Sequence, residues 1–230
     1  MDIDPLQVET LQPELFLFGE TSAGTLELFP AVWAACEELV APEMQVRQKG
    51  LEKLLALKAP RLSPLVTYIL ATRVTEPDHA LRKLVASALA DLLLVDSQGL
   101  AAPENVRRTL YTYLSQIRQP AILALLEISL SDADMETKLA TLLNVCPEGG
   151  SILLEILSDR KNPLELRCQA VRLINRVGYL DTLPELEKLA ARLESRSLGQ
   201  QVMPFVPPAS QSEQALLIEI QSALTSLRQP

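Results

Sequence analysis

The chain has 230 residues and a formal net charge of −8, and 48% of its residues are hydrophobic although only 4% are aromatic. The apolar residues are mostly leucine, alanine, valine and isoleucine, and only 8 glycines are present, which favours packed helices over a sheet-rich fold. The acidic balance makes nucleic acid and anionic membranes poor non-specific partners, because both present negatively charged phosphates.

Apolar residues at spacings of three and four, the period of an amphipathic helix, run through most of the chain. They predict helices between residues 25 and 195, at about 26–39, 46–58, 62–70, 81–95, 106–117, 121–130, 132–145, 151–158, 164–177 and 183–193. Residues 1–24 are irregular, and we expect them to cap the open end of the helical stack. Residues 196–212 predict an apolar, proline-containing linker or strap, and residues 213–230 return to helix.

Four of these helices begin alike. Each start contains a proline, whose missing N–H is harmless in a first helical turn, and these prolines are Pro42, Pro77, Pro103 and Pro163. An acidic residue follows within two positions, and an arginine comes about one turn later, at Arg47, Arg82, Arg107 and Arg167. A recurring helix start indicates a recurring structural unit.

The recurring starts resemble the second helix of HEAT repeats. The matching stretches are Val46-Arg47 with Gly50 and Leu54, Leu81-Arg82 with Val85 and Leu89, and Leu166-Arg167 with Ala170 and Ile174. The resemblance covers residues 25–195 and implies a right-handed α-solenoid of stacked antiparallel helix pairs, as in the armadillo and HEAT families. Two units depart from the pattern, because residues 132–136 lack the arginine and residues 103–130 contain an unusually placed proline.

The recurrent arginines have two interpretations. Each can pair with an acid on its own or a neighbouring helix, since Glu43 and Arg47, like Asp78 and Arg82, have the favourable i, i+4 spacing. The row would then be a structural ladder between repeats. Alternatively, the four arginines bind a partner on one surface.

The sequence shows no catalytic constellation. It has a single histidine, His79, whereas deoxyhypusine hydroxylases, which are enzymes of HEAT type, hold two irons with several His-Glu pairs. Bilin lyases share the repeat type, but no residue here specifies a tetrapyrrole. HEAT-like DNA glycosylases need a basic face with an acid and aromatic residues. The nearest approach to such a face is the set Arg107, Arg108, Tyr111, Tyr113 and Arg118, in which Tyr113 falls on an apolar stripe.

The other polar features have plain structural explanations. Three cysteines, an odd number without CxxC spacing, predict buried, reduced thiols: Cys36, Cys146 and Cys168. Residues 147–151 (Pro-Glu-Gly-Gly-Ser) predict a turn between helices rather than an anion-binding loop, because they lack the lysine of a phosphate loop. Neither a secretion signal nor a membrane span is evident, so we expect a cytoplasmic protein.

The stretch 202–208 is the most distinctive local feature. Its Met203 and Phe205 would either anchor a strap on the helices or belong to a proline-rich docking peptide. We predict a non-catalytic scaffold that binds another protein or peptide and needs no metal or cofactor. The alternatives are a HEAT-type enzyme or nucleic-acid-binding protein, and a homo-oligomer that associates through the apolar helix at 216–227.

Overall fold

The computed structural model describes the backbone of residues 22–130, 132–202 and 211–229, and the side chains of residues 29–130, 132–196 and 213–229. Within these ranges every regular element is a helix, so the all-α prediction is confirmed. The predicted capping segment, residues 1–24, lies outside the described residues except for its last three, which begin the first helix. Met203 and Phe205 also lie outside them.

The helices agree with the predicted ones to within a few residues at nearly every end. Their bounds are α1 Ser22–Leu39, α2 Met44–Ala56, α3 Ala59–Leu62, α4 Pro64–Ala71, α5 His79–Leu93, α6 Glu104–Leu114, α7 Gln119–Ser129, α8 Ala133–Leu143, α9 Gly149–Ser158, α10 Leu164–Val177, α11 Leu183–Val202 and α12 Gln211–Leu227. Two 3-10 turns, η1 Thr72–Thr75 and η2 Leu180–Thr182, follow α4 and precede α11.

The end of α11 is the exception. The linker predicted over 196–212 is wrong for residues 196–202, which continue the helix to Val202, and for residues 211 and 212, which begin α12. The apolar stripe fades after Leu193, but residues 194–202 contain no proline, and one glycine among glutamines and serines does not end a helix.

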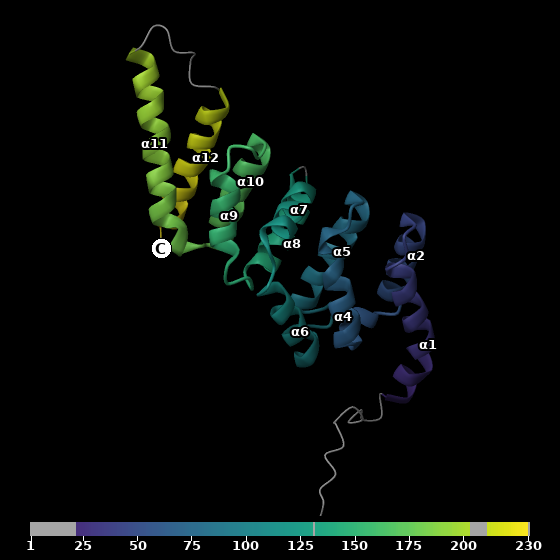
Figure 1. Ribbon diagram of the computed structural model, residues 1–230. Helices are drawn as coiled ribbons and strands as arrows, with labels where there is room; N and C mark the ends of the chain where they lie inside the picture. The colour runs from purple at the N-terminus through teal and green to yellow at the C-terminus, as the bar shows by residue number, and fades with distance from the viewer. Residues whose placement is uncertain (1–21, 131, 203–210, 230) are drawn as a thin grey trace, which may run out of the picture.

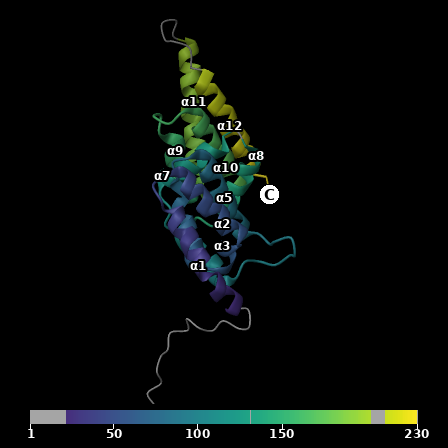
Figure 2. The same ribbon diagram turned by 90° about the vertical axis from the view of Figure 1, so that its right-hand side faces the viewer.

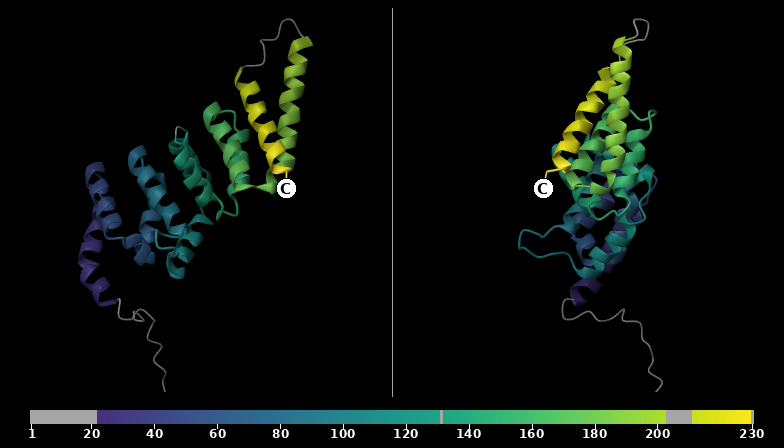
Figure 3. Two further views of the ribbon diagram at one scale, coloured as in Figure 1. Left: turned by 180° about the vertical axis from the view of Figure 1, so that it is seen from behind. Right: turned by 90° about the vertical axis from the view of Figure 1, so that its left-hand side faces the viewer.

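Neighbouring helices pack in pairs, and the pairs follow one another in chain order along the molecule (Figure 1). The pairs are α1 with α2, α4 with α5, α7 with α8, α9 with α10, and α11 with α12. The second helices make a row in which α2, α5, α8, α10 and α12 each contact the next. The view from behind shows α1 and α12 at opposite ends (Figure 3). In the perpendicular view, the loop between α5 and α6 projects from the side of the helices (Figure 2).

Residues 103–130, which contain the unusually placed proline, form two helices, α6 and α7, instead of one. Helix α6 packs beside α4, whereas α7, which carries Pro120 near its start, packs against η1 and α5. Residues 115–118 between the two helices are not helical. This break leaves the ends of α6 and α7 at an open surface.

The four recurring prolines lie just before their helices, not in the first turn. Pro103 and Pro163 are N-cap residues, whereas Pro42 and Pro77 precede the N-caps Glu43 and Asp78. The prediction was therefore wrong by one or two positions. An N-cap takes extended backbone, and proline with φ −52° and ψ 147° supplies it. At the other end of α10, Gly178 has φ 83° and caps the helix.

Gly50 allows α1 and α2 to pack closely. A Cβ at this position would lie 2.6 Å from the backbone nitrogen of Leu39 and 2.7 Å from the carbonyl oxygen of Ala35. Because both atoms belong to the backbone of α1, neither can move without shifting that helix. The small residue that follows Val46-Arg47 therefore sets the distance between two helices.

Candidate partner-binding groove

The guanidinium of Arg47 on α2 forms hydrogen bonds with residues of its own and the neighbouring helix pair. It donates to both carboxylate oxygens of Glu76, with 2.6 Å between Nη2 and Oε1, and to the carbonyl of Pro42 at 2.5 Å. Glu76 lies just before α5, so the ion pair joins two neighbouring helix pairs. The predicted i, i+4 partner, Glu43, makes no ion pair with Arg47 among the described residues.

Arg82 on α5 makes a similar connection toward α7. Its Nε donates to the carbonyl of Glu76 at 2.6 Å, and its Nη1 donates to the carbonyl of Ala124 and the carboxylate of Glu127 at 2.7 and 2.8 Å. The predicted partner, Asp78, instead accepts from the backbone N–H of Leu81 and caps α5. Thus the second predicted i, i+4 pair is also wrong.

The remaining two arginines differ from each other. Arg167 on α10 donates from Nε to the carbonyl of Leu157 at the end of α9, at 2.7 Å. Arg107 lies on α6, outside the row of second helices, and pairs with Glu104 in its own first turn at 2.5 Å. The equivalent position of α8 holds Glu136, which accepts from Arg176 of α10 at 2.8 Å. The interpretation as a structural ladder is therefore favoured for Arg47 and Arg82, which bond to neighbouring pairs and have little freedom to hold a partner. Arg167 uses only its Nε, within its own pair, and Arg107 pairs within its own helix.

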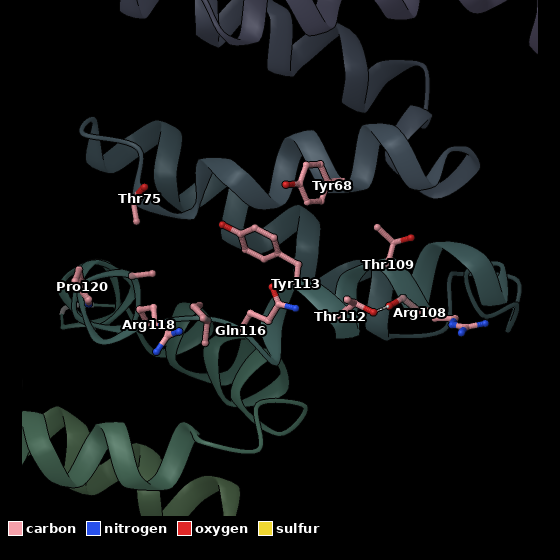
Figure 4. A pocket seen from close by; sticks show the side chains of 11 residues that line it. Tyr68, Thr75, Arg108, Thr109, Thr112, Tyr113, Gln116, Arg118 and Pro120 are labelled. Carbon is pink, nitrogen blue, oxygen red and sulfur yellow. Dashed lines mark hydrogen bonds between the residues drawn. The ribbon is translucent and has the colours of Figure 1, made fainter.

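An open hollow of about 570 Å³ lies between α4 and η1 on one side and α6 and the start of α7 on the other (Figure 4). Tyr68 projects from α4 and Tyr113 from α6, and their ring centroids are 6.0 Å apart in an edge-to-face arrangement. Tyr68 is 51% exposed and Tyr113 is half-buried, so the ring of Tyr68 is the more accessible to solvent. Burial, with a smaller contribution from Tyr68, raises the pKa of the Tyr113 hydroxyl, which therefore stays neutral at physiological pH.

Two arginines flank the tyrosine pair. Arg108 and Arg118 appear on opposite sides of it in Figure 4, and both are exposed. Neither forms an ion pair with another residue in the part of the chain whose side chains are described. This distinguishes them from Arg47 and Arg82, whose donors are consumed by the fold.

A second hollow, of about 730 Å³, continues the first toward α9. The two share Gln116, Ile117, Arg118 and Pro120 in the break between α6 and α7, and the second is bordered by Glu148 and Glu155. We call the two hollows together the groove. One end of the groove is aromatic and basic and the other end is acidic, so the groove presents both charges along one path.

The sequence indicated this groove only in part. Arg108, Tyr113 and Arg118 belong to the basic and aromatic set singled out there, and the structure brings them together at the groove. Tyr68 was missed, because its helix gave no sign of which neighbour it would meet. Arg107 of the same set faces Glu104 instead, and Tyr111 does not line the groove.

His79 and the three cysteines, to which the sequence analysis assigned no function, can be located in the structure. His79 is the exposed first residue of α5, with its Nε2 3.9 Å from Glu127, and the three cysteines are buried and unpaired. The described residues contain no group of three or more histidine, cysteine or acidic side chains placed to hold a metal ion. None of the described helices has the length and apolar character needed to cross a membrane.

The start of α9 is covered by an aromatic ring. Tyr179 donates its hydroxyl to the carbonyl of Leu143 at 2.5 Å, and a Cβ on Gly149 would lie 2.9 Å from its Cζ. Gly150 is also covered, since a Cβ there would lie 3.1 Å from Cγ of the same ring. The two glycines thus make room for Tyr179, and the alternative of an anion-binding loop is not supported.

No protein-family model and no curated protein matches this chain.

Proposed function

We propose that the chain is a non-catalytic scaffold, a HEAT-like right-handed α-solenoid that binds an extended segment of another protein in the groove. The repeat interpretation is supported by the helix pairs and by the row of second helices in mutual contact. It is also supported by Arg47 and Arg82 of that row, which hydrogen-bond to neighbouring pairs. In a stack of this kind each unit contacts only its neighbours, and an extended surface is left for partners.

The tyrosine pair with its flanking arginines is the observation that carries the proposal. Tyrosine and arginine contribute most of the binding energy in many protein interfaces, because they combine a large apolar surface with directional donors. Here Arg108, Arg118 and half of Tyr68 remain available to a partner. Since an arginine lies on each side of the tyrosine pair and the groove then continues to Glu148 and Glu155, the best-fitting segment has an aromatic or aliphatic residue flanked by acidic residues, with a basic residue farther along.

A peptide library selected on the purified protein tests the proposal. Clones that also bind a variant with Tyr68→Ala and Arg118→Ala are discarded, and the surviving peptides are measured by fluorescence anisotropy. A truncated anchor typically weakens binding by about 1–2 kcal/mol or more, so we expect the double variant to bind at least about tenfold more weakly. The control is Arg228→Ala, which alters a surface pair with Glu187 that lines neither hollow of the groove. If no peptide distinguishes the wild type from the double variant, the groove does not bind protein segments.

Single-stranded nucleic acid is a second candidate for the same groove, because bases stack on tyrosine and phosphates pair with arginine. The net charge of −8 and the acidic end of the groove oppose it. Anisotropy of labelled oligonucleotides between roughly 50 and 200 mM salt separates the candidates, since phosphate-based affinity falls steeply with salt. Sedimentation over a range of concentrations identifies a homo-oligomer, the third alternative.

A further inference from the structure

Four arginines converge where the last helix pair meets the one before it. Arg160 lies in the loop between α9 and α10, Arg167 is on α10, and Arg192 and Arg196 are on α11. They line one small hollow of about 70 Å³ together with Glu213 at the start of α12. Figure 1 shows this junction near the upper ends of α9, α10 and α12, beside α11.

The charges at this hollow are strongly unbalanced for an acidic protein. Four arginines line the hollow with one acidic residue, Glu213, and the charge of Asp159 also acts on Arg167. The carboxylate of Glu213 lies 3.5 Å from Arg160 and 3.4 Å from Arg196, which are the long distances of weak ion pairs. Like charges brought together in one place repel one another, so an arrangement of this kind is stabilised when an anion enters.

Most guanidinium N–H groups of these four arginines form no hydrogen bond with another described residue. Arg167 uses its Nε for the carbonyl of Leu157 and Arg192 uses its Nε for the carbonyl of Lys188. Apart from these bonds and the two weak pairs with Glu213, no hydrogen bond joins the four guanidinium groups to a side chain or carbonyl in the described part of the chain. Each guanidinium carries five N–H donors, so several remain available for a ligand.

The four arginines differ in how far they are exposed to solvent, and this difference indicates how a ligand is held. Arg160 and Arg196 have side chains that are 62% and 44% exposed, so an anion can reach them from solvent. Arg167 lies deeper, and burial, followed by the charge of Arg160, lowers the pKa of its guanidinium. The site therefore has an accessible rim and a partly desolvated base, where a hydrogen bond to an anion is strongest.

We propose that Arg160, Arg167, Arg192 and Arg196 form a binding site for a phosphate group. The hollow, of about 70 Å³, is far smaller than the two hollows of the groove, so it fits a small group rather than an extended segment. A phosphate is preferred over a carboxylate because it brings up to two negative charges and three acceptor oxygens to donors that Glu213 leaves unsatisfied. The phosphate comes either from a phosphorylated protein segment or from a free small molecule.

Arginine side-chain NMR tests the site with inorganic phosphate as the probe. The Nε–Hε signals of the protein are followed during titration with phosphate at constant ionic strength, with chloride as the reference salt. We expect saturable shifts that a variant with Arg160→Gln and Arg196→Gln weakens at least about tenfold in apparent Kd. Arg172→Gln, which removes a surface pair with Glu219 on the adjacent face, is the matched control and should leave the affinity unchanged.

Glu213→Gln provides a test that a purely structural cluster would fail. Removing the only lining carboxylate ends its competition with the ligand, so phosphate affinity should rise several-fold even if the folded state becomes less stable. The same titration with an acetylated, amidated phosphoserine pentapeptide identifies the source of the phosphate. Tighter binding of the peptide than of inorganic phosphate indicates a protein segment, and equal binding indicates a free ligand. Shifts identical in phosphate and chloride, or unaffected by both the arginine and the Glu213 variants, would overturn the proposal.

Discussion

Arg47 and Glu76 form an ion pair between two neighbouring helix pairs, with 2.6 Å between Nη2 and Oε1. The Glu76 side chain is only 1% exposed and that of Arg47 is 12% exposed, so the charges depend on each other for solvation. The carbonyl of Glu76 in turn accepts from Arg82, so one residue joins the arginines of two successive second helices.

Arg47→Met should destabilise the fold severely, because it leaves a buried carboxylate without its partner. Breaking a buried pair in this way costs about 3–5 kcal/mol, which denaturant unfolding can measure. Arg228→Met is the matched control, since its pair with Glu187 is about half exposed and should contribute less than ~1 kcal/mol.

A second change separates lost packing from an unpaired charge. Adding Glu76→Gln to Arg47→Met removes the isolated charge, so the double variant should be more stable than Arg47→Met alone. If Arg47→Met and Arg228→Met have equal effects on the free energy of unfolding, the ion pair does not connect the two helix pairs as described.

Gly50→Ala should push α1 away from α2. The added Cβ meets the backbone of Leu39 at 2.6 Å and that of Ala35 at 2.7 Å, so the usual gain in helix propensity is outweighed. Forced overpacking of this kind costs about 1–3 kcal/mol, which lowers the midpoint of denaturant unfolding. Gln45→Ala, at an exposed position of the same helix, is the control and should leave the midpoint nearly unchanged.

The helices could be predicted from the sequence because their information is local. The spacing of Leu81, Val85 and Leu89 marks a buried face, and all three are buried in α5. The partners of charged residues could not be predicted in this way. The nearest acid in sequence to Arg47 is Glu43, yet Glu76, 29 positions away, holds it. Local spacing gives only a weak i, i+4 preference, and the packing of the next helix pair overrides it.

The groove could not be predicted from the sequence either, because it also depends on contacts between distant segments. Tyr113 was placed on the apolar stripe, which agrees with its half-buried position, but its contact with Tyr68 depends on α6 packing beside α4. The helix break at residues 115–118 creates that surface. The sequence showed the break through Pro120 but not the direction in which the chain would turn.

The two groove tyrosines should respond differently to truncation. Tyr113→Ala removes a half-buried ring and its edge-to-face contact, so it should lower the free energy of unfolding by about 1–3 kcal/mol. Tyr68→Ala removes a ring that is 51% exposed and should cost less than ~1.5 kcal/mol, the range of an aromatic pair. Urea unfolding of both variants checks this order. A larger loss for Tyr68→Ala would place that residue in the core rather than at the binding surface.

The buried thiol of Cys146 should make the protein sensitive to alkali. Burial raises the pKa of this thiol to about 12, against 9.0 for an ordinary thiol. Above pH 9 the unfolded chain releases a proton that the folded chain retains, so the unfolded state binds fewer protons and the free energy of unfolding falls with pH. This contribution is fully present below pH 9 and is lost as the pH approaches about 12.

Cys146→Ala removes that titration, so its stability should fall less steeply than that of the wild type between pH 9 and about 12. Burial, followed by the charge of Cys146, also raises the pKa of Tyr179, so the difference between the two curves reports the thiol together with its effect on Tyr179. Urea unfolding at successive pH values gives the curves, and reaction with a thiol reagent at pH 8, roughly one unit below the ordinary thiol pKa, gives an independent check. In the native protein Cys146 should react only after unfolding. Parallel curves together with rapid native labelling would show that the thiol is not buried as described.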